Sequence, residues 1–511
     1  MQQQENTKTR VCSSPLHILL YGFTIVCLTY SKAFWDSWHG TTDSSTGNFY
    51  KLASNKLKVM LNRQYENQFN ITTPVKELHL CDVGWEVEKL EPNLYELPRQ
   101  DSSITHEKGF LTPTKLVEPI YDKPMFQLNP DKFFLPVLVG GPNNQIIGFQ
   151  DSLFTAIKLN RTIVIPKFFK HFTDTQVTAS RGLSYIYPGH RVNCEILCKF
   201  ISCITLDQFQ EACGHKVDAI TNIRSIDAKG IAQLEGEFGM QITSNLATKE
   251  SVRNEVHFVP NKLSSGKLNT STLTEKLSTP ARCLIHPRPL FDLDIRIDKN
   301  YEDPGKQKDS DLMKLVIQHT KHPEYISKIA EQFVNSTMRN RNFLTVHWRY
   351  NEGDYLKRCR NDIENSKNPR GDKRLEFCQN AINMKADGLA SRIENKIDSL
   401  LDEIDVTDVY IASPYNVRNI VAEVSGILKL KRNWQVTSST DLENYMEEKY
   451  QSCSVIQKHL NDILSTIEME ICGRGIVFLS SARSTWSSNV RFSRTINNDA
   501  GVFPKYDENV F

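Results

Sequence analysis

The stretch FFLPVLVGGPNNQIIGFQDSLFTAIKLNRTIVIP, residues 133–166, decides the fold. It begins with an apolar run, breaks at residues 140–144 and ends with a second apolar run from residue 162. Between the two runs, apolar side chains at positions 146, 149, 153 and 157 recur at the spacing of one helix face. We therefore expect a helix at 144–160 between two buried strands, which is the βαβ unit of a parallel sheet.

The break itself, Gly140-Gly141-Pro142-Asn143-Asn144, stands at the mouth of the predicted helix. The first backbone N–H groups of a helix have no partner within it, and their partial positive charge attracts anions. Glycine lets a backbone approach a ligand closely, and an asparagine amide both donates and accepts hydrogen bonds. Gly141, Asn143 and Asn144 are therefore candidate substrate-binding residues. The alternative is a tight turn in which an asparagine caps the helix.

A second α/β series fills the C-terminal part of the chain. Strands are predicted at 341–350, 407–414 and 475–481, and helices at 376–404, 417–431 and 451–473. A helical segment at 311–338 precedes the series and is able to bridge two domains. The expected fold class is α/β, with two Rossmann-like doubly wound domains that face each other across a cleft lined by strand carboxyl ends.

The second candidate strand end is LTVHWRYNEGDY, residues 344–355. His347 and Arg349 are two residues apart on a strand, so their side chains leave the same face. A guanidinium at a strand end binds phosphate well because it is planar, charged and bidentate. Glu352 and Asp354 follow in the loop as sugar ligands, a general base, or partners of Arg349. A purely structural pair between the arginine and a carboxylate is the alternative.

The third candidate strand end is FLSSARSTWSSNVRFSR, residues 478–494. An apolar strand leads into Ser484 and Thr485, whose hydroxyl groups lie at the start of a predicted helix and favour an anion-binding turn. Trp486 is able to pack against a sugar or a base, although a buried core tryptophan fits as well. The stretch lacks the glycine and lysine of a P-loop.

The composition is that of an ordinary globular protein, with 39% hydrophobic and 24% charged residues. A formal net charge of +2 gives no reason to expect a nucleic-acid partner. Lys8 and Arg10 precede an apolar run at 16–30, and Ser31-Lys32-Ala33 fits a signal-peptidase site. A cleaved signal peptide and a single-pass type II membrane anchor both fit, so we expect the lumen of the endoplasmic reticulum or Golgi.

Cysteine usage agrees with an oxidising compartment. Ten cysteines lie outside the targeting segment, and an even number there favours disulfides. Cys194, Cys198 and Cys203 are spaced loosely and have no histidine at ligand distance, which argues against zinc. The glycosylation tripeptides at 70, 160, 269 and 335 fit lumenal exposure.

Taken in order, GGPNNQ, HWRYNEGD, VYIAS and FLSSARSTWS resemble the motifs of the GDP-fucose protein O-fucosyltransferase superfamily. The resemblance covers roughly Phe133 to Arg494 and extends to plant-type members. It implies a GT-B-like glycosyltransferase that needs no metal and transfers fucose from GDP-fucose, with inversion, to a protein or glycan hydroxyl. The implied divisions are a signal or anchor at 1–33, a stem at 34–130, an N-terminal Rossmann-like domain at 131–310 and a C-terminal nucleotide-sugar-binding domain at 311–511.

The resemblance also implies roles for single residues. Arg349 matches the arginine that neutralises the GDP diphosphate, and His347 matches a neighbouring nucleotide contact. Asn143 and Asn144 match a loop asparagine near the sugar, and Ser484, Thr485 and Trp486 match a phosphate-binding turn. These residues, together with Glu352, Asp354 and Gly141, make up the candidate site.

The chain departs from the family pattern in its first loop, where glycines stand in place of an acidic residue or an arginine. That loop therefore offers no general base, so Glu352 or Asp354 acts, or the leaving diphosphate takes the acceptor proton. Two alternatives remain: a catalytically inactive member that binds glycans or proteins in the lumen, and a transferase that uses another deoxy-sugar nucleotide.

Overall fold

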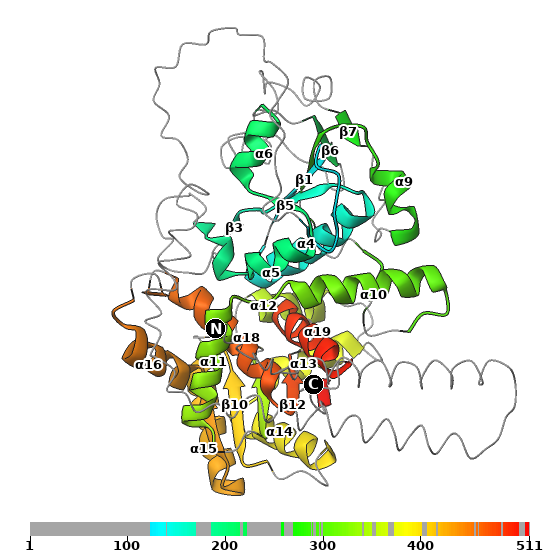
Figure 1. Ribbon diagram of the computed structural model, residues 1–511. Coiled ribbons are helices and arrows are strands. Elements are labelled where there is room, and N and C mark those ends of the chain that lie inside the picture. Colours follow the sequence, from blue (N-terminus) through cyan, green and yellow to red (C-terminus); the bar gives the residue numbers. More distant parts are fainter. Residues whose placement is uncertain are drawn as a thin grey trace, which may run out of the picture. The chain divides into compact units, whose positions relative to one another are not determined.

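The computed structural model describes residues 123–509 with gaps, the longest of which are 170–184, 222–256 and 260–268. All of the described residues belong to one compact unit, Leu78–Phe511. The predicted targeting segment 1–33 and nearly all of the predicted stem 34–130 lie outside the described residues. Two parallel sheets with helices around them confirm the expected α/β class (Figure 1).

The first sheet has the strand order β5-β2-β1-β8-β6-β7, and all of its neighbouring strands are parallel. Its strands are β1 (Phe133–Val137), β2 (Thr162–Val164), β5 (Cys203–Ile204), β6 (Ala219–Thr221), β7 (His257–Val259) and β8 (Cys283–Pro287). Helix α4 (Pro142–Lys158) joins β1 to β2, which confirms the predicted βαβ unit. A separate antiparallel pair consists of β3 (Phe168–Phe169) and β4 (Tyr185–Ile186).

The second sheet has the strand order β11-β10-β9-β12-β13 and is also parallel throughout. Its strands are β9 (Phe343–His347), β10 (Asp408–Ala412), β11 (Gln435–Ser438), β12 (Val477–Ser480) and β13 (Tyr506–Asn509). The predicted strands at 341–350, 407–414 and 475–481 correspond to β9, β10 and β12. Strands β11 and β13 were not predicted, because short polar runs carry little periodic signal.

The helices around the sheets share the amphipathic character expected of layers that cover a sheet. In the first half of the described chain, which ends with α10 at His319, these helices are α5 (Cys194–Phe200), α6 (Leu206–Ala212), α9 (Leu273–Leu277) and α10 (Pro304–His319). Short 3₁₀ turns lie at Pro188–His190 and Thr270–Thr272. In the second half they are α11 (Glu324–Thr337), α12 (Asp354–Glu364), α13 (Lys373–Asn383), α14 (Ala386–Leu400), α15 (Arg418–Arg432), α16 (Ser439–Tyr450), α18 (Leu460–Arg474) and α19 (Thr485–Asp499).

Each sheet is buried on both faces, as a doubly wound sheet must be. Alternate residues of β1 divide between two apolar clusters: Phe134 packs with residues of α4 and α10, whereas Phe133 packs with Phe209 of α6. In β9, Phe343 and Leu344 divide in the same way between the two clusters that cover the second sheet. The alternation shows that helices cover both faces of each sheet.

The predicted helix at 311–338 is two helices, α10 and α11. The chain breaks before Pro323, because the proline ring restricts the residue in front of it and removes a donor. Met313 and Val316 of α10 pack in the core of the first half, whereas Ile326 of α11 packs in the core of the second half. The predicted bridging segment therefore contacts both cores, and the expected division at residue 310 stays a prediction.

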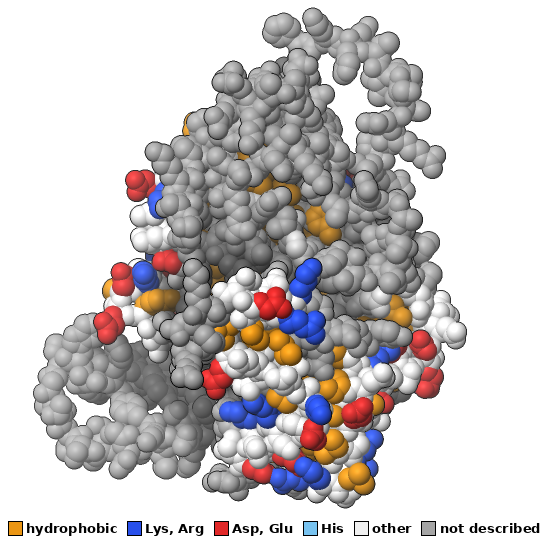
Figure 2. Space-filling view, turned by 180° about the vertical axis from the view of Figure 1, so that it is seen from behind, with side chains coloured by type: hydrophobic (Ala, Val, Ile, Leu, Met, Phe, Trp, Pro, Cys, Tyr) orange, Lys and Arg blue, Asp and Glu red, His pale blue; other side chains and the backbone are white. Residues whose placement is uncertain are grey.

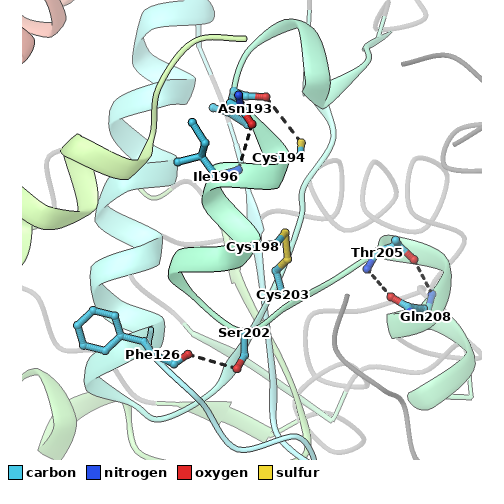
Figure 3. The surroundings of a disulfide bond; sticks show 10 residues. Phe126, Asn193, Cys194, Ile196, Cys198, Ser202, Cys203, Thr205 and Gln208 are labelled. Atoms are coloured by element: carbon cyan, nitrogen blue, oxygen red, sulfur yellow. Dashed lines mark hydrogen bonds between the residues drawn. A yellow bond between two sulfur atoms is a disulfide. The ribbon is translucent and has the colours of Figure 1, made fainter. Parts of the chain in front are cut away.

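Disulfides tie several of these elements together, as the cysteine count predicted. Cys198 bonds Cys203 across the end of α5, and further bonds join Cys213 to Cys283 and Cys359 to Cys378. Figure 3 shows the first of these bonds beside the capping box in which Thr205 and Gln208 close the start of α6. Two of the three cysteines considered for zinc are thus used in a disulfide.

The surface of the second half carries mixed charge. Figure 2 shows acidic and basic side chains interspersed over the described part of one face. Ion pairs such as Lys431 with Glu394 and Arg432 with Asp398 link α15 to α14. Among the described residues, no helix is both long enough and apolar enough to span a membrane.

Candidate active site

The topology of each sheet marks one place for a ligand. In the second sheet, the chain leaves β9 towards β10 on one side and leaves β12 towards β13 on the other. In the first sheet, β1 and β8 are neighbours, and β1 is connected to β2 on the opposite side. Ligands of open parallel sheets bind at such switch points, beyond the carboxyl ends of the strands. The three candidate stretches follow β1, β9 and β12, which are the strands at these two points.

The glycine and asparagine turn after β1 is held in one conformation. Gly140 has a φ of 81°, in the left-handed region that favours glycine, and an added Cβ there would stand 2.9 Å from Asn144 Nδ2. The buried Gln145 donates to Gly140 O at 2.9 Å and accepts from Phe169 N–H at 2.8 Å, which ties the turn to β3. The turn is therefore a fixed structure.

Helix α4 begins at this turn without the usual side-chain cap. Gly141 is its N-cap residue, Pro142 follows at the first helical position, and the first turn contains no acidic residue. The predicted alternative, an asparagine that caps the helix, is therefore wrong, because glycine takes that position. An uncapped helix start keeps its backbone N–H groups and partial positive charge available to an anion.

His347, the last residue of β9, is buried and held by the third candidate stretch. Its Nδ1 lies 2.8 Å from Ser487 Oγ, and its ring stacks on Trp486 with the centroids 4.1 Å apart. Ser481 Oγ donates to His347 O at 2.7 Å. Burial, reinforced by the positive charge of Arg349, lowers the pKa of His347 to about 3. The imidazole is therefore neutral at physiological pH.

The turn after β12 leads into α19 through the predicted serine. Ser484 is buried, and its Oγ accepts from Ser487 N–H at 3.4 Å as a helix cap does. Thr485 is half-buried at the first position of α19. Trp486 is only 6% exposed and donates from Nε1 to Ser465 Oγ at 3.1 Å. The tryptophan thus forms part of the core and supports His347 by stacking, and its predicted contact with substrate stays a prediction.

One hydrogen-bonded pair connects the two halves at this place. Asn489 of α19 donates from Nδ2 to both the backbone oxygen and the side-chain oxygen of Asn143, at 3.2 Å each. Asn489 is 7% exposed, and Asn144 next to the contact is half-buried. The asparagine turn, the hydroxyl-rich turn and His347 therefore form one cluster built from three strand ends.

Arg349 stands two residues beyond His347, and its side chain is exposed. Its positive charge contributes to the lowered pKa of His347. Asp354 is the first residue of α12, and Glu352 lies outside the described residues. The roles predicted for these two carboxylates stay predictions.

Sequence reasoning missed three polar residues that organise the cluster. Ser481 and Ser487 hold His347, and Asn489 holds Asn143. The run of serines after β12 was a signal for the first two. Nothing in the local sequence distinguishes Asn489, because its partner lies in another half of the chain.

A cluster of this kind suits a ligand that carries both phosphate and sugar. Helix starts and an exposed arginine attract a diphosphate, while neutral amide and hydroxyl groups bind sugar hydroxyls. Together with two doubly wound sheets, these features are typical of α/β proteins that bind nucleotides at strand ends.

The comparisons with known proteins give the family. The model of the GDP-fucose protein O-fucosyltransferase family matches residues 134–497, and the chain belongs to that family. The predicted class of enzyme, a GDP-fucose-dependent glycosyltransferase, is thus confirmed. Among curated proteins, none matches the chain.

Several solved fucosyltransferases are similar to the chain. POFUT1 in complex with GDP-fucose is 15% identical, with a TM-score of 0.47 over 75% of this chain and 99% of that chain. POFUT1 in complex with GDP is also 15% identical, with a TM-score of 0.46 over the same shares. The fucosyltransferase NodZ from Bradyrhizobium is 10% identical, with a TM-score of 0.35 over 71% of this chain and 93% of that chain.

Proposed function

We propose that the chain transfers fucose from GDP-fucose, with inversion, to a hydroxyl group of a protein or glycan. The proposal rests on the contact between Asn489 and Asn143. This contact joins the switch point of the first sheet to the switch point of the second. Family membership supplies the donor. The cluster supplies the groups that a nucleotide sugar needs at the bond that breaks.

In the proposed reaction, the bond between fucose C1 and the β-phosphate oxygen breaks, and GDP leaves with the electron pair. Arg349 and the uncapped start of α4 stabilise the negative charge that develops on the diphosphate. The acceptor oxygen bonds C1 from the opposite face. Its proton passes to Glu352 or Asp354, or to the leaving diphosphate.

Two buried oxygens support a sugar at this place. Asn144 Oδ1 and Asn489 Oδ1 accept no hydrogen bond from any residue that the structure describes. A buried acceptor without a donor is costly, and a sugar hydroxyl is a donor of the right size. The asparagine amides therefore suit the fucose end of the donor.

The decisive experiment replaces the arginine. Arg349→Ala should keep the fold and lose about 2–4 kcal/mol of transition-state stabilisation, which is roughly 30- to 1,000-fold in kcat. Arg360→Ala is the matched control, because it removes another exposed guanidinium, from α12. Unchanged turnover in Arg349→Ala would refute the role of the arginine. Calorimetry of the unmodified protein with GDP distinguishes an active transferase from a catalytically inactive lumenal module. The transferase should bind GDP, and the inactive module should not.

The proposed location is the lumen of the endoplasmic reticulum or Golgi. Three disulfides within the described residues, together with family membership, support an oxidising compartment. Asn269 and Asn335 are exposed, each in a glycosylation tripeptide. A glycosidase should therefore increase the electrophoretic mobility of the secretory-pathway product, and Asn269→Gln with Asn335→Gln should reduce that shift.

A further inference from the structure

Ser487 is the residue that faces the ring nitrogen of His347. Its Oγ lies 2.8 Å from Nδ1, and the Trp486 ring covers one face of the imidazole at 4.1 Å. The serine side chain is 3% exposed and the histidine 5%, so water has little access to the pair. A hydrogen bond in such surroundings must be assigned by counting donors and acceptors.

The count gives one arrangement. Ser481 N–H donates to Ser487 Oγ at 3.1 Å, so the serine oxygen already accepts one hydrogen bond. If Nδ1 carried a proton, the oxygen would receive a second N–H. Its own hydrogen would then be buried, with no acceptor among the residues that the structure describes. That loss costs more than the alternative, in which the hydroxyl donates to an unprotonated Nδ1.

We propose that Ser487 is a positioning residue that fixes His347 in the tautomer with its hydrogen on Nε2, so that the neutral ring donates this N–H to an anionic oxygen of the nucleotide sugar. The inference rests on the proposed function for its ligand. The tautomer itself follows from the protein alone. A neutral donor of fixed orientation binds an oxyanion without transferring a proton to it.

The tautomer has a direct spectroscopic signature. In the full chain labelled with ¹⁵N-histidine, His347→Gln identifies the His347 signals among those of 13 histidines. The unmodified protein should show an unprotonated Nδ1 and a protonated Nε2, unchanged between pH 5 and 8. A protonated Nδ1 would overturn the proposal, and this measurement requires no variant of Ser487.

Ser487→Ala should remove the preference of His347 for the tautomer protonated on Nε2. Nδ1 and Nε2 should then both give ¹⁵N signals between those of a protonated and an unprotonated ring nitrogen. The dissociation constant of this variant for GDP should rise about tenfold, because a misoriented ring loses one hydrogen bond to the ligand. Thr495→Ala is the matched control, since it removes another hydroxyl from α19, one that donates to Arg491 O at 2.9 Å, and should change neither reading.

The ¹⁵N signals of His347 and the affinity for GDP test this inference separately from the proposed function. If the unmodified protein has the expected tautomer and does not bind GDP, the proposed function fails and the assignment of the ring stands. If GDP binds and Ser487→Ala leaves the nitrogen signals unchanged, the positioning role of Ser487 is overturned alone.

Discussion

Asn489 and Asn143 are 346 residues apart in the chain, yet the side-chain amide of the first donates to the second at two oxygens, 3.2 Å away in each case. Asn143 lies in the first turn of α4, beside the first sheet, and Asn489 lies in α19, beside the second sheet. The contact therefore sets the position of one candidate ligand-binding turn relative to the other.

Replacing Asn489 should reveal this role. Asn489→Ala removes two hydrogen bonds to Asn143 and leaves its side-chain oxygen without this donor, so we expect the free energy of unfolding to fall by about 1–2 kcal/mol and affinity for GDP-fucose to fall about tenfold. Asn497→Ala is the control, because Asn497 is an exposed asparagine on the same helix. Denaturant titration and calorimetry measure the two effects. Equal values for both variants would remove Asn489 from the site.

The buried ion pair between Arg191 and Asp462 should matter more for stability. Arg191 follows the 3₁₀ turn of the first half, and Asp462 lies on α18 of the second, with side chains 4% and 3% exposed. Asp462→Ala would leave a buried cation unpaired, at a cost of about 3–5 kcal/mol in denaturant titration. Glu195→Ala breaks the exposed pair with Lys199 and should cost less than about 1 kcal/mol. A loss of less than about 1 kcal/mol in Asp462→Ala would show that the buried ion pair contributes little to the free energy of unfolding.

Two helical glycines should respond oppositely to alanine. A Cβ at Gly148 in α4 would stand 1.9 Å from Pro289 O, so Gly148→Ala must displace the helix and should cost about 1–3 kcal/mol. At Gly426 in α15, an added Cβ meets nothing within 4 Å, so Gly426→Ala should stabilise by up to about 1 kcal/mol. Thermal unfolding of both variants tests the pair. A stabilising Gly148→Ala would contradict the close approach of α4 to Pro289, two residues after β8.

Glu468 should make stability depend on pH. Burial raises the pKa of this carboxyl from 4.5 to about 7, although Ser439 and Tyr410 donate hydrogen bonds to it. Between these two values the folded state holds a proton that the unfolded state has lost. Stability therefore falls as pH rises from 4.5 to 7, by at most about 1.4 kcal/mol per pH unit.

Glu468→Gln removes this titration, so its stability relative to the unmodified protein should improve as pH rises through that window. Glu447→Gln, at an exposed position on α16, serves as the control and should leave the slope as it is. Urea titrations at pH 5, 6 and 7 measure the slopes. Parallel curves for Glu468→Gln and the unmodified protein would show that the carboxyl keeps an ordinary pKa.

Regular periodicity explains which parts of the fold were predictable. The apolar spacing from position 146 to position 157 predicted α4, and the strands on either side were correct. The segment 376–404 was predicted as one helix, but it is α13 and α14, separated at residues 384–385. Helix α16 was not predicted, because its buried side chains are few and its surface is polar.

The site was predictable only where a residue follows a strand. His347 is the last residue of β9, and Arg349 and Ser484 follow β9 and β12, so the rule that ligands bind at strand ends was enough to select them as candidates. Trp486 fits both a sugar contact and a core position in the sequence, and in the structure its ring is buried against His347 while the sugar contact stays a prediction. Asn489 depends on packing between two helices far apart in the sequence, and no local pattern encodes such a contact.

The separation of Asn143 from Asn489 has a consequence for biosynthesis. A ribosome completes α4 long before it reaches α19. The asparagine turn at the start of α4 therefore gains its contact with Asn489 only when nearly the whole protein has been synthesised. Nascent chains stopped before α19 should therefore fail to capture the nucleotide, however well their first sheet has formed.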